Sequence, residues 1–409
     1  MQEEAQSRVA PASRDADLTT TQLIIVTGGR LALVAAFRII YPLQPFLTGE
    51  LGIDLRTASA LITVQLAASM LSPIGGALAD TRGERATMSG GLALFASGTL
   101  LCALSPSFLA FLIGYVLVGL AVALYQPAGQ AYLAARTPYT RRGWALGVFE
   151  TSWALGALGV FETSWALGAL LGVAPLMQVV QATQRSAPVF WILLVAGLAS
   201  LALVHTLLPD GQRRAPNETH RVEWRELRTP GALLALLFMA LTLCAYDLIQ
   251  IVQAPWLHET LAMNEAQLGQ LFALAGIGEL AGSLGVALVG DRLGIRRSTA
   301  AGFLLAAICV AVLPFVGQNL ALLLPTFLLL YLTFEYAIVA SFPLVSAVAP
   351  AARATMLALS TASTGAGRVV ASLVAPSLWL TYGINWTATI TVAILCMSLL
   401  CLLVIRPQE

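Results

Sequence analysis

The chain has 409 residues, of which 58% are hydrophobic and 11% charged, and its formal net charge is +1. This composition excludes an ordinary soluble domain. The sequence contains no lysine, and a phosphate-binding loop needs one, so an ATP-driven pump within this chain is also excluded.

Residues 1–21 are polar and acidic and lack an apolar core, so we expect a disordered cytoplasmic tail. Beyond the tail, the chain carries apolar runs of about 20 residues, enough for a helix to cross roughly 30 Å of hydrocarbon. We therefore predict an all-α membrane protein with twelve transmembrane helices. Their expected ranges are 22–46, 56–79, 86–104, 107–133, one within 145–182, 187–208, 230–254, 265–290, 298–316, 319–346, 354–380 and 384–405.

The predicted helices form two groups of six. An N-terminal bundle at 22–208 and a C-terminal bundle at 230–409 are separated by the Arg-rich linker 209–229. Most arginines fall in the tail, the linker and the loops on one side of the predicted membrane. Since cytoplasmic loops carry the excess of basic residues, we expect a multi-pass protein of the cell membrane with both termini in the cytoplasm.

The two halves correspond at their first turns. Pro45-Phe46-Leu47 is expected to end the first helix, and Pro255-Trp256-Leu257 to end the seventh. Asp54 and Asn264 then stand as N-caps of the second and eighth helices.

A charged motif also recurs in both halves. Residues 76–85 read GALADTRGER, and residues 287–297 read ALVGDRLGIRR. The shared frame is an Asp, a Gly three residues later and an Arg two residues beyond. The Gly permits a positive φ, the Arg stays on the cytoplasmic side, and the Asp can face the N-terminal end of a neighbouring helix. We assign these cytoplasmic gate loops Gly76, Asp80, Gly83, Arg85, Asp291, Gly294 and Arg296.

These loops resemble the signature loop between helices two and three of the major facilitator superfamily of secondary transporters. Thr81 and Glu84 stand where that pattern has basic residues, and Ala287 replaces the leading Gly of the second loop. The resemblance implies pseudo-symmetric six-helix halves with a substrate site between them near the membrane midplane.

The stretch from Phe334-Glu335-Tyr336 to Gly367-Arg368 resembles helices ten and eleven of the bacterial efflux-permease branch. Two departures leave the antiport assignment and the transport direction open. Tyr115 replaces the helix-four Arg of drug–proton antiporters. The helix-five Gly-Pro signature is reduced to Gly168, Gly172 and Pro175.

An exact duplication interrupts the correspondence, because residues 145–156 and 157–168 both read ALGVFETSWALG. Twelve helical residues rotate a face by about 120°, so Glu150 and Glu162 cannot occupy equivalent environments. We expect the second copy, with Glu162, in the membrane and the first copy in the cytoplasm; the reverse register is the alternative.

Charged residues inside predicted helices mark the functional site, since each costs a few kcal/mol or more in hydrocarbon. We interpret Glu335 and Asp247 as the proton-coupling carboxylates, with Arg38 and Arg368 as partners; a structural pairing of Arg368 with Glu335 or Glu279 is the alternative. Arg30 is expected to snorkel. Tyr125, Gln126 and Pro127 are expected to break helix four. The predicted cavity residues are Arg38, Tyr41, Gln44, Tyr125, Gln126, Glu162, Gln250, Glu279 and Arg368.

Secondary active transport by alternating access is the function these features favour, as proton-coupled efflux of amphiphilic or hydrophobic compounds. Transport of sugar or another polar solute, and a transport-dead homologue acting as a receptor or scaffold, are the alternatives. An enzyme is not expected, because none of His205, His220 and His258 is central. We expect a monomer that works with a small-molecule substrate, protons and the lipid bilayer, without cofactor, metal or nucleic acid.

Overall fold

The computed structural model describes residues 19–104, 107–136, 166–209, 228–349 and 353–405. Within these ranges every regular element is a helix. Most of the predicted tail, most of the linker 209–229 and nearly all of the duplication, including Glu150 and Glu162, lie outside the described residues.

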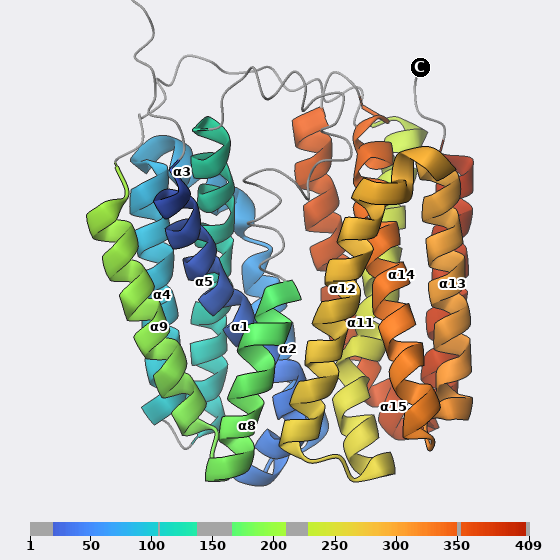
Figure 1. The fold of residues 1–409 in the computed structure, drawn as a ribbon, viewed down its shortest axis with the longest axis horizontal. Helices are drawn as coiled ribbons and strands as arrows, with labels where there is room; N and C mark the ends of the chain where they lie inside the picture. Colours follow the sequence, from blue (N-terminus) through green and yellow to red (C-terminus); the bar gives the residue numbers. More distant parts are fainter. Residues whose placement is uncertain (1–18, 105–106, 137–165, 210–227, 350–352, 406–409) are drawn as a thin grey trace, which may run out of the picture.

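The helices form two bundles side by side, with the first half of the chain in one and the second half in the other (Figure 1). The N-terminal bundle contains α1 (Thr20–Leu51), α2 (Leu55–Ser69), α3 (Ser72–Arg82), α4 (Glu84–Leu104), α5 (Phe108–Ala135), η2 (Gly168–Val173), α8 (Ala174–Thr183) and α9 (Ala187–Leu207). The C-terminal bundle contains α11 (Pro230–Leu261), α12 (Glu265–Leu293), α13 (Ile295–Val316), α14 (Leu320–Ser346) and α15 (Arg353–Val404).

These elements account for the predicted twelve helices, and the all-α membrane fold in two six-helix halves is confirmed. Nine helices in the described part of the chain are long and apolar enough to cross a membrane. The pair α2 and α3, bent by 41°, makes one more span, and η2 with α8 continues as a shorter apolar helix. The last two spans share α15, whose Gly383 breaks the helix with a φ of 74°.

The structure corrects the expected effect of several prolines. Helix α1 runs through Pro45 to Leu51, and α11 runs through Pro255 to Leu261. Helix α5 likewise continues through Pro127, which was expected to break it. A proline removes one hydrogen bond within a membrane helix, but neighbouring helices and side chains can satisfy the freed groups, so the helix continues.

The turns follow the sequence more closely. Asp54 accepts a hydrogen bond from the Thr57 N–H at 2.8 Å, and Asn264 accepts one from the Gln267 N–H at 2.9 Å, so both are N-caps as predicted. Gly83 and Gly294 end α3 and α12 with φ values of 94° and 76°. Only glycine adopts such values readily, which explains its place in both repeated motifs.

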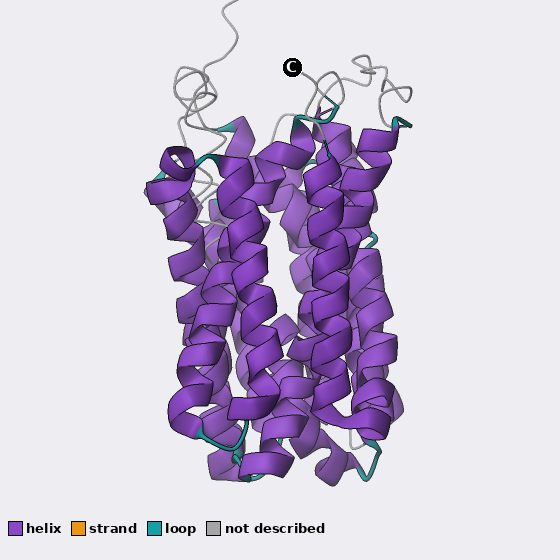
Figure 2. Ribbon diagram, turned by 90° about the vertical axis from the view of Figure 1, so that its right-hand side faces the viewer, coloured by secondary structure: helices purple, strands orange, loops and turns teal. Residues whose placement is uncertain are grey.

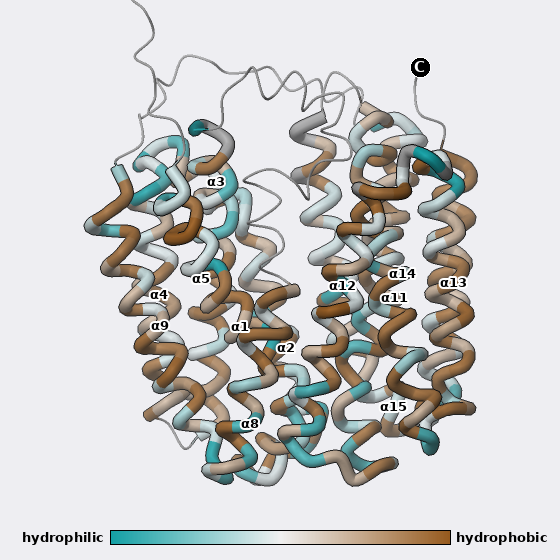
Figure 3. Tube along the Cα trace, viewed as in Figure 1, coloured by the Kyte–Doolittle hydropathy of each residue, from teal (hydrophilic) through white to brown (hydrophobic). Residues whose placement is uncertain are grey.

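The outer surface of the bundles is apolar, as a bilayer requires. Hydrophobic residues cover the length of α9 and α13, and hydrophilic residues gather near the helix ends (Figure 3). Exposed side chains such as Val195 on α9 and Ile308 on α13 belong to this surface. The helices run roughly parallel along the long direction of each bundle in both views (Figures 1 and 2).

The two halves meet through glycines that allow close approach. A Cβ added at Gly276 of α12 would lie 2.6 Å from the Ala166 carbonyl oxygen, and one at Gly269 would lie 2.6 Å from the Met177 Cβ. On the other seam, Gly365 of α15 faces the flexible Met70 side chain. These contacts hold the halves together around a central space.

Candidate functional site

A cavity of about 620 Å³ lies between the two halves, in contact with helices from both. Arg30, Gly76 and Thr361 line it, and these residues lie toward the end of the molecule where α1 begins and α3 and α12 end. At the opposite end, Leu47 and Leu257 are completely buried. The cavity is therefore directed toward the end that carries the repeated loops.

The cavity wall is largely apolar, with a few polar groups set into it. Phe37, Leu66 and Val122 contribute from the N-terminal half, and Phe334 and Phe342 from the C-terminal half. Its charged lining residues are Arg30, Glu279, Glu335 and Arg368. An apolar space with a small number of placed polar groups is the usual form of a small-molecule site.

The first ion pair near the cavity joins the two halves. Arg38 of α1 donates from Nη1 to Glu279 Oε2 at 2.5 Å and from Nη2 to Oε1 at 2.9 Å. Their side chains are only 2% and 3% exposed. The Tyr246 hydroxyl also donates to Glu279 Oε1, at 3.0 Å. Such a bidentate pair is both strong and geometrically specific.

The second ion pair lies within the C-terminal half. Arg368 of α15 donates from Nε to Asp247 Oδ2 of α11 at 2.8 Å. It also donates from Nη2 to the Tyr41 hydroxyl at 3.1 Å, which brings α1 into the same network. Asp247 is fully buried, and its Oδ1 has no hydrogen-bond partner among the residues that the structure describes. Buried polar atoms are nearly always hydrogen-bonded in folded proteins, so this oxygen is an exception beside the cavity.

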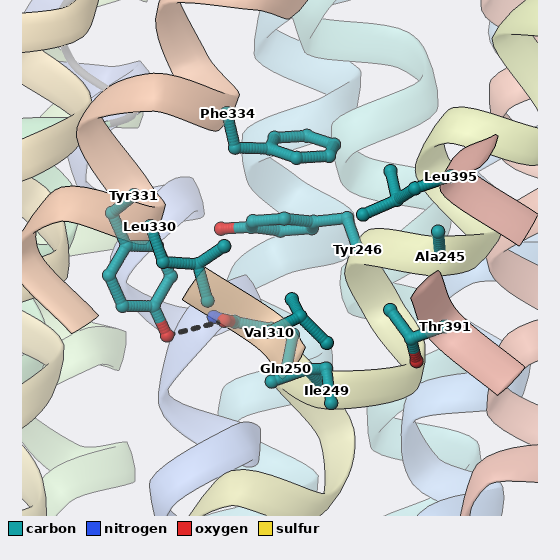
Figure 4. A pocket seen from close by; sticks show the side chains of 10 residues that line it. All are labelled: Ala245, Tyr246, Ile249, Gln250, Val310, Leu330, Tyr331, Phe334, Thr391 and Leu395. Atoms are coloured by element: carbon teal, nitrogen blue, oxygen red, sulfur yellow. Dashed lines mark hydrogen bonds between the residues drawn. The ribbon is translucent and has the colours of Figure 1, made fainter. Parts of the chain in front are cut away.

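Glu335 of α14 faces the cavity near these pairs. The Ser283 hydroxyl of α12 donates to Glu335 Oε1 at 3.0 Å. The preceding residue, Phe334, stacks on Tyr246 with ring centroids 4.5 Å apart. Figure 4 shows these two rings lying one above the other. Both belong to the lining of a small void of about 10 Å³.

Several predicted cavity residues are instead part of the packed interior near the closed end. The Gln44 side chain donates to the Ile251 carbonyl oxygen at 3.3 Å and accepts from Ser59 at 3.0 Å. Tyr331 donates to Gln250 Oε1 at 2.8 Å, a bond drawn in Figure 4. These bonds link helices and leave little polar surface for a solute.

The predicted site residues thus divide by position. Of the predicted site residues, five line the cavity: Gly76, Gln126, Glu279, Glu335 and Arg368. Others are buried beside it or beyond it: Arg38, Tyr41, Gln44, Tyr125, Asp247 and Gln250. Tyr125 donates to the Val26 carbonyl oxygen at 2.8 Å. Glu162 lies outside the described residues, and the functional roles of all these residues stay predictions.

Among the cavity-lining residues outside the predicted set are an arginine and a glutamine. Arg30 lines the cavity and is 4% exposed, although it was expected to snorkel. Gln130 lines it together with Gln126, one helical turn away on α5. The spacing of four residues between these two glutamines places them on one helix face and was a usable signal.

The repeated loops use their arginines in the same way. Arg85 donates to the His205 carbonyl oxygen at 2.5 Å, in the last turn of α9. Arg296 donates to the Leu403 carbonyl oxygen at 2.5 Å, near the end of α15. A cation at a helix C-terminus satisfies carbonyls that have no partner within the helix. The arginine of each loop therefore binds the C-terminal end of the last helix in its own half.

Two six-helix membrane bundles that enclose a central cavity between them define the architecture of a secondary transporter. The chain belongs to the Major Facilitator Superfamily, whose family model matches residues 26–252 and 238–409. It is thus a multi-pass membrane protein of a transporter family.

Individual relatives are distant. The multidrug resistance protein MdtG of Citrobacter koseri is 26% identical over 299 residues, which cover 70% of this chain and 68% of that protein. The uncharacterized MFS-type transporter YceJ of Bacillus subtilis is 24% identical over 346 residues, or 83% and 84% of the two chains. A second such Bacillus subtilis protein, YwfA, is 30% identical over 137 residues, 32% of each chain.

Solved structures also resemble this molecule, and one of them covers nearly all of it. The human organic anion transporter MFSD10 superposes with a TM-score of 0.67 over 93% of this chain and 99% of its own, at 18% sequence identity. At that identity the likeness concerns the fold alone.

Proposed function

We propose that the protein is a secondary transporter that exports amphiphilic or hydrophobic compounds in exchange for protons. The observation that carries this proposal is the cavity itself. Its volume of about 620 Å³ suits a drug-sized molecule, its walls are largely apolar and aromatic, and two carboxylates face it. The similarity to MdtG, named as a multidrug resistance protein, supports the same class of substrate.

Alternating access requires the cavity to face each side of the membrane in turn. With both termini in the cytoplasm, as the arginine distribution favours, the cavity in this structure faces inward. An exporter loads its substrate in that state. The protein works as a monomer in the cell membrane, because one chain supplies both halves around the cavity.

Proton coupling is assigned to Glu335 and Asp247. Protonation removes a negative charge from a region of low dielectric, and this lowers the cost of closing the halves around the site. Substrate and proton then bias the same equilibrium between inward and outward states, which is all that coupling requires. Arg368, which binds Asp247, is the partner that favours release of the proton.

The test is transport by the purified chain in proteoliposomes under an imposed pH gradient. Fluorescent amphiphilic cations, neutral amphiphiles and sugars serve as separate substrate arms. Efflux of an amphiphile that stops when the gradient is collapsed supports the proposal. Uptake of a sugar without amphiphile transport would replace the substrate class, and no transport of any arm would favour a receptor or scaffold.

The coupling residues need their own variants. Glu335→Gln with Asp247→Asn should retain amphiphile binding and lose the dependence on the pH gradient. Glutamine and asparagine keep the size of each side chain and imitate its protonated form. Gradient-driven transport that survives in the double variant would return both acids to a structural role.

A further inference from the structure

The end of the molecule opposite the repeated loops, which we call the outer end, is closed where α1 meets α11. Leu43 and Leu47 of α1 and Leu257 of α11 are completely buried there. Gln44 is completely buried among them, and its Nε2 donates to the Ile251 carbonyl oxygen of α11 at 3.3 Å. This hydrogen bond therefore joins the two halves inside a layer of buried apolar side chains.

The acceptor of this bond is a carbonyl that its own helix cannot satisfy in the usual way. In an α-helix the Ile251 carbonyl accepts from the N–H of residue 255. Residue 255 is a proline, which has no N–H, yet α11 continues through Pro255 to Leu261. Neighbouring helices and side chains satisfy such freed carbonyls in membrane proteins. Gln44 does so from the other half of the molecule.

A second bond fixes the direction in which the Gln44 amide points. The Ser59 hydroxyl of α2 donates to Gln44 Oε1 at 3.0 Å. A backbone carbonyl can only accept, so the nitrogen of the amide faces Ile251 and its oxygen faces Ser59. Ser59 is 1% exposed and lies in the same half as Gln44. The donor is thus held by one half, and the acceptor belongs to the other.

Gln65 makes a similar bond with a different consequence. Its Nε2 donates to the Phe37 carbonyl oxygen at 2.9 Å, and Gln65 is also completely buried. Gln65 on α2 and Phe37 on α1 belong to the same half, so their bond can persist when the halves move. The residue four positions after Phe37 is Tyr41, which has an N–H to donate within the helix.

We propose that Gln44 is a positioning residue that keeps the outer end closed, by supplying the donor that Pro255 withholds from the Ile251 carbonyl. The amide satisfies this carbonyl while the halves are in contact, and water can replace the amide once the outer end opens. Removal of the amide therefore penalises the closed form alone, because a buried carbonyl without a partner is costly. The equilibrium then shifts toward the outward-open form.

The transport cycle in which this movement has a meaning rests on the proposed function. The movement itself needs neither substrate nor gradient, and no change of charge takes part in it. It can therefore be measured in the resting protein, separately from transport.

The experiment measures the opening of the outer end in purified full-length protein in lipid nanodiscs. Spin labels on Gly49→Cys and Thr260→Cys report it, because these exposed residues lie near the outer ends of α1 and α11. The five native cysteines are replaced by alanine. Gln44→Met removes the amide and keeps a side chain of similar length. The population with the longer label separation should rise about tenfold, which corresponds to about 1.4 kcal/mol.

Two further variants separate this role from ordinary packing. Gln65→Met loses the same kind of bond within one half and should leave the label separation unchanged. Pro255→Ala returns an N–H to α11, so the Ile251 carbonyl no longer depends on the amide. In that background Gln44→Met should change the population by less than about twofold, the limit expected when two sites no longer depend on each other. The double variant also guards against a folding defect in Gln44→Met, because its carbonyl has a partner within the helix.

Several results would overturn the inference. They are an unchanged label separation in Gln44→Met, an equal shift in Gln65→Met, and a shift of the same size with proline or alanine at position 255. Failure of the double variant to fold would also overturn it, because the amide would then serve the fold as a whole. The expected shift in protein that transports no amphiphile would leave the role of Gln44 intact and refute only the proposed function.

Discussion

The two ion pairs at the centre of the molecule have similar chemistry and different mechanical positions. Arg38–Glu279 joins the halves, and Arg368–Asp247 joins two helices of one half. Rigid bundles that rock against each other must change the first contact and can preserve the second. The two buried ion pairs therefore differ in what they connect: one lies between the halves and one lies inside a bundle.

The largest loss of stability is expected when the Arg368–Asp247 pair, which lies within one half, is broken. Arg368→Leu leaves the fully buried Asp247 without its guanidinium, and the loss of one partner of a buried pair costs about 3–5 kcal/mol. Thermal unfolding in detergent should show a clear drop in the melting midpoint. The double variant Arg368→Leu with Asp247→Leu should recover most of it.

The corresponding leucine substitutions at Arg38 and Glu279 test the ion pair between the halves. They should cost less, since the halves can separate and allow water to reach the remaining charge. Equal losses at both pairs would show that the contact between the halves is as permanent as the contact within one, and the distinction would fail.

The next largest loss of stability is expected when glycines at tight helix contacts are replaced by alanine. A Cβ at Gly367 would collide with the Ala240 carbonyl oxygen, between the helices that carry Arg368 and Asp247. Gly367→Ala should therefore destabilise the protein by about 1–3 kcal/mol. Gly276→Ala, on the seam between the halves, should cost less and shift the inward–outward equilibrium.

Gly28→Ala is the control for these substitutions, because no atom of the described part of the chain lies within 4 Å of its added Cβ. It should be neutral or slightly stabilising in a helix. Thermal unfolding in detergent compares the three variants. A melting midpoint for Gly367→Ala equal to that of Gly28→Ala would mean that α11 and α15 are not packed as tightly as described.

The sequence was sufficient for the fold because hydrophobic length and repeated turns are local signals. Apolar runs located the helices, and the two Asp-Gly-Arg frames located equivalent loops. The predictions were wrong at Pro45, Pro127 and Pro255. Proline disfavours the interior of a helix, so each was expected to end or break one, but contacts with neighbouring helices allow the helix to continue.

The site was less predictable, because depth along a helix can be counted from sequence and rotation about its axis cannot. Glu279 and Asp247 were both predicted as site residues because each is a charged residue inside a predicted helix. The sequence could not show that Glu279 reaches Arg38 across the boundary while Asp247 turns to Arg368. For the same reason Gln44 was assigned to the cavity, although it binds the Ile251 carbonyl oxygen.

A smaller effect is expected at the loop arginines, which lie one in each half. Arg85→Gln and Arg296→Gln should each cost about 0.3–1 kcal/mol, the usual worth of a cation at a helix C-terminus. Because both fasten the last helix of their own half, the losses should be similar and should add in the double variant. Unequal changes in the melting midpoint would show that the two loops contribute differently to stability although they make the same contact.

The smallest effect on stability is expected at the two N-caps, Asp54 and Asn264. Only Asp54 can change its charge with pH. Hydrogen bonds from Thr57 hold the pKa of Asp54 below its ordinary value of 3.8. A folded-state pKa that is lowered gives stability that is fully present above the ordinary value and is lost as the pH falls through the folded-state value. Asn264 does the same capping in the other half without a charge. Melting midpoints measured through this acidic range should therefore fall less steeply in Asp54→Asn than in the natural chain, whereas Asn264→Asp should steepen the fall. Parallel curves for all three proteins would show that the cap of α2 does not depend on the charge of Asp54.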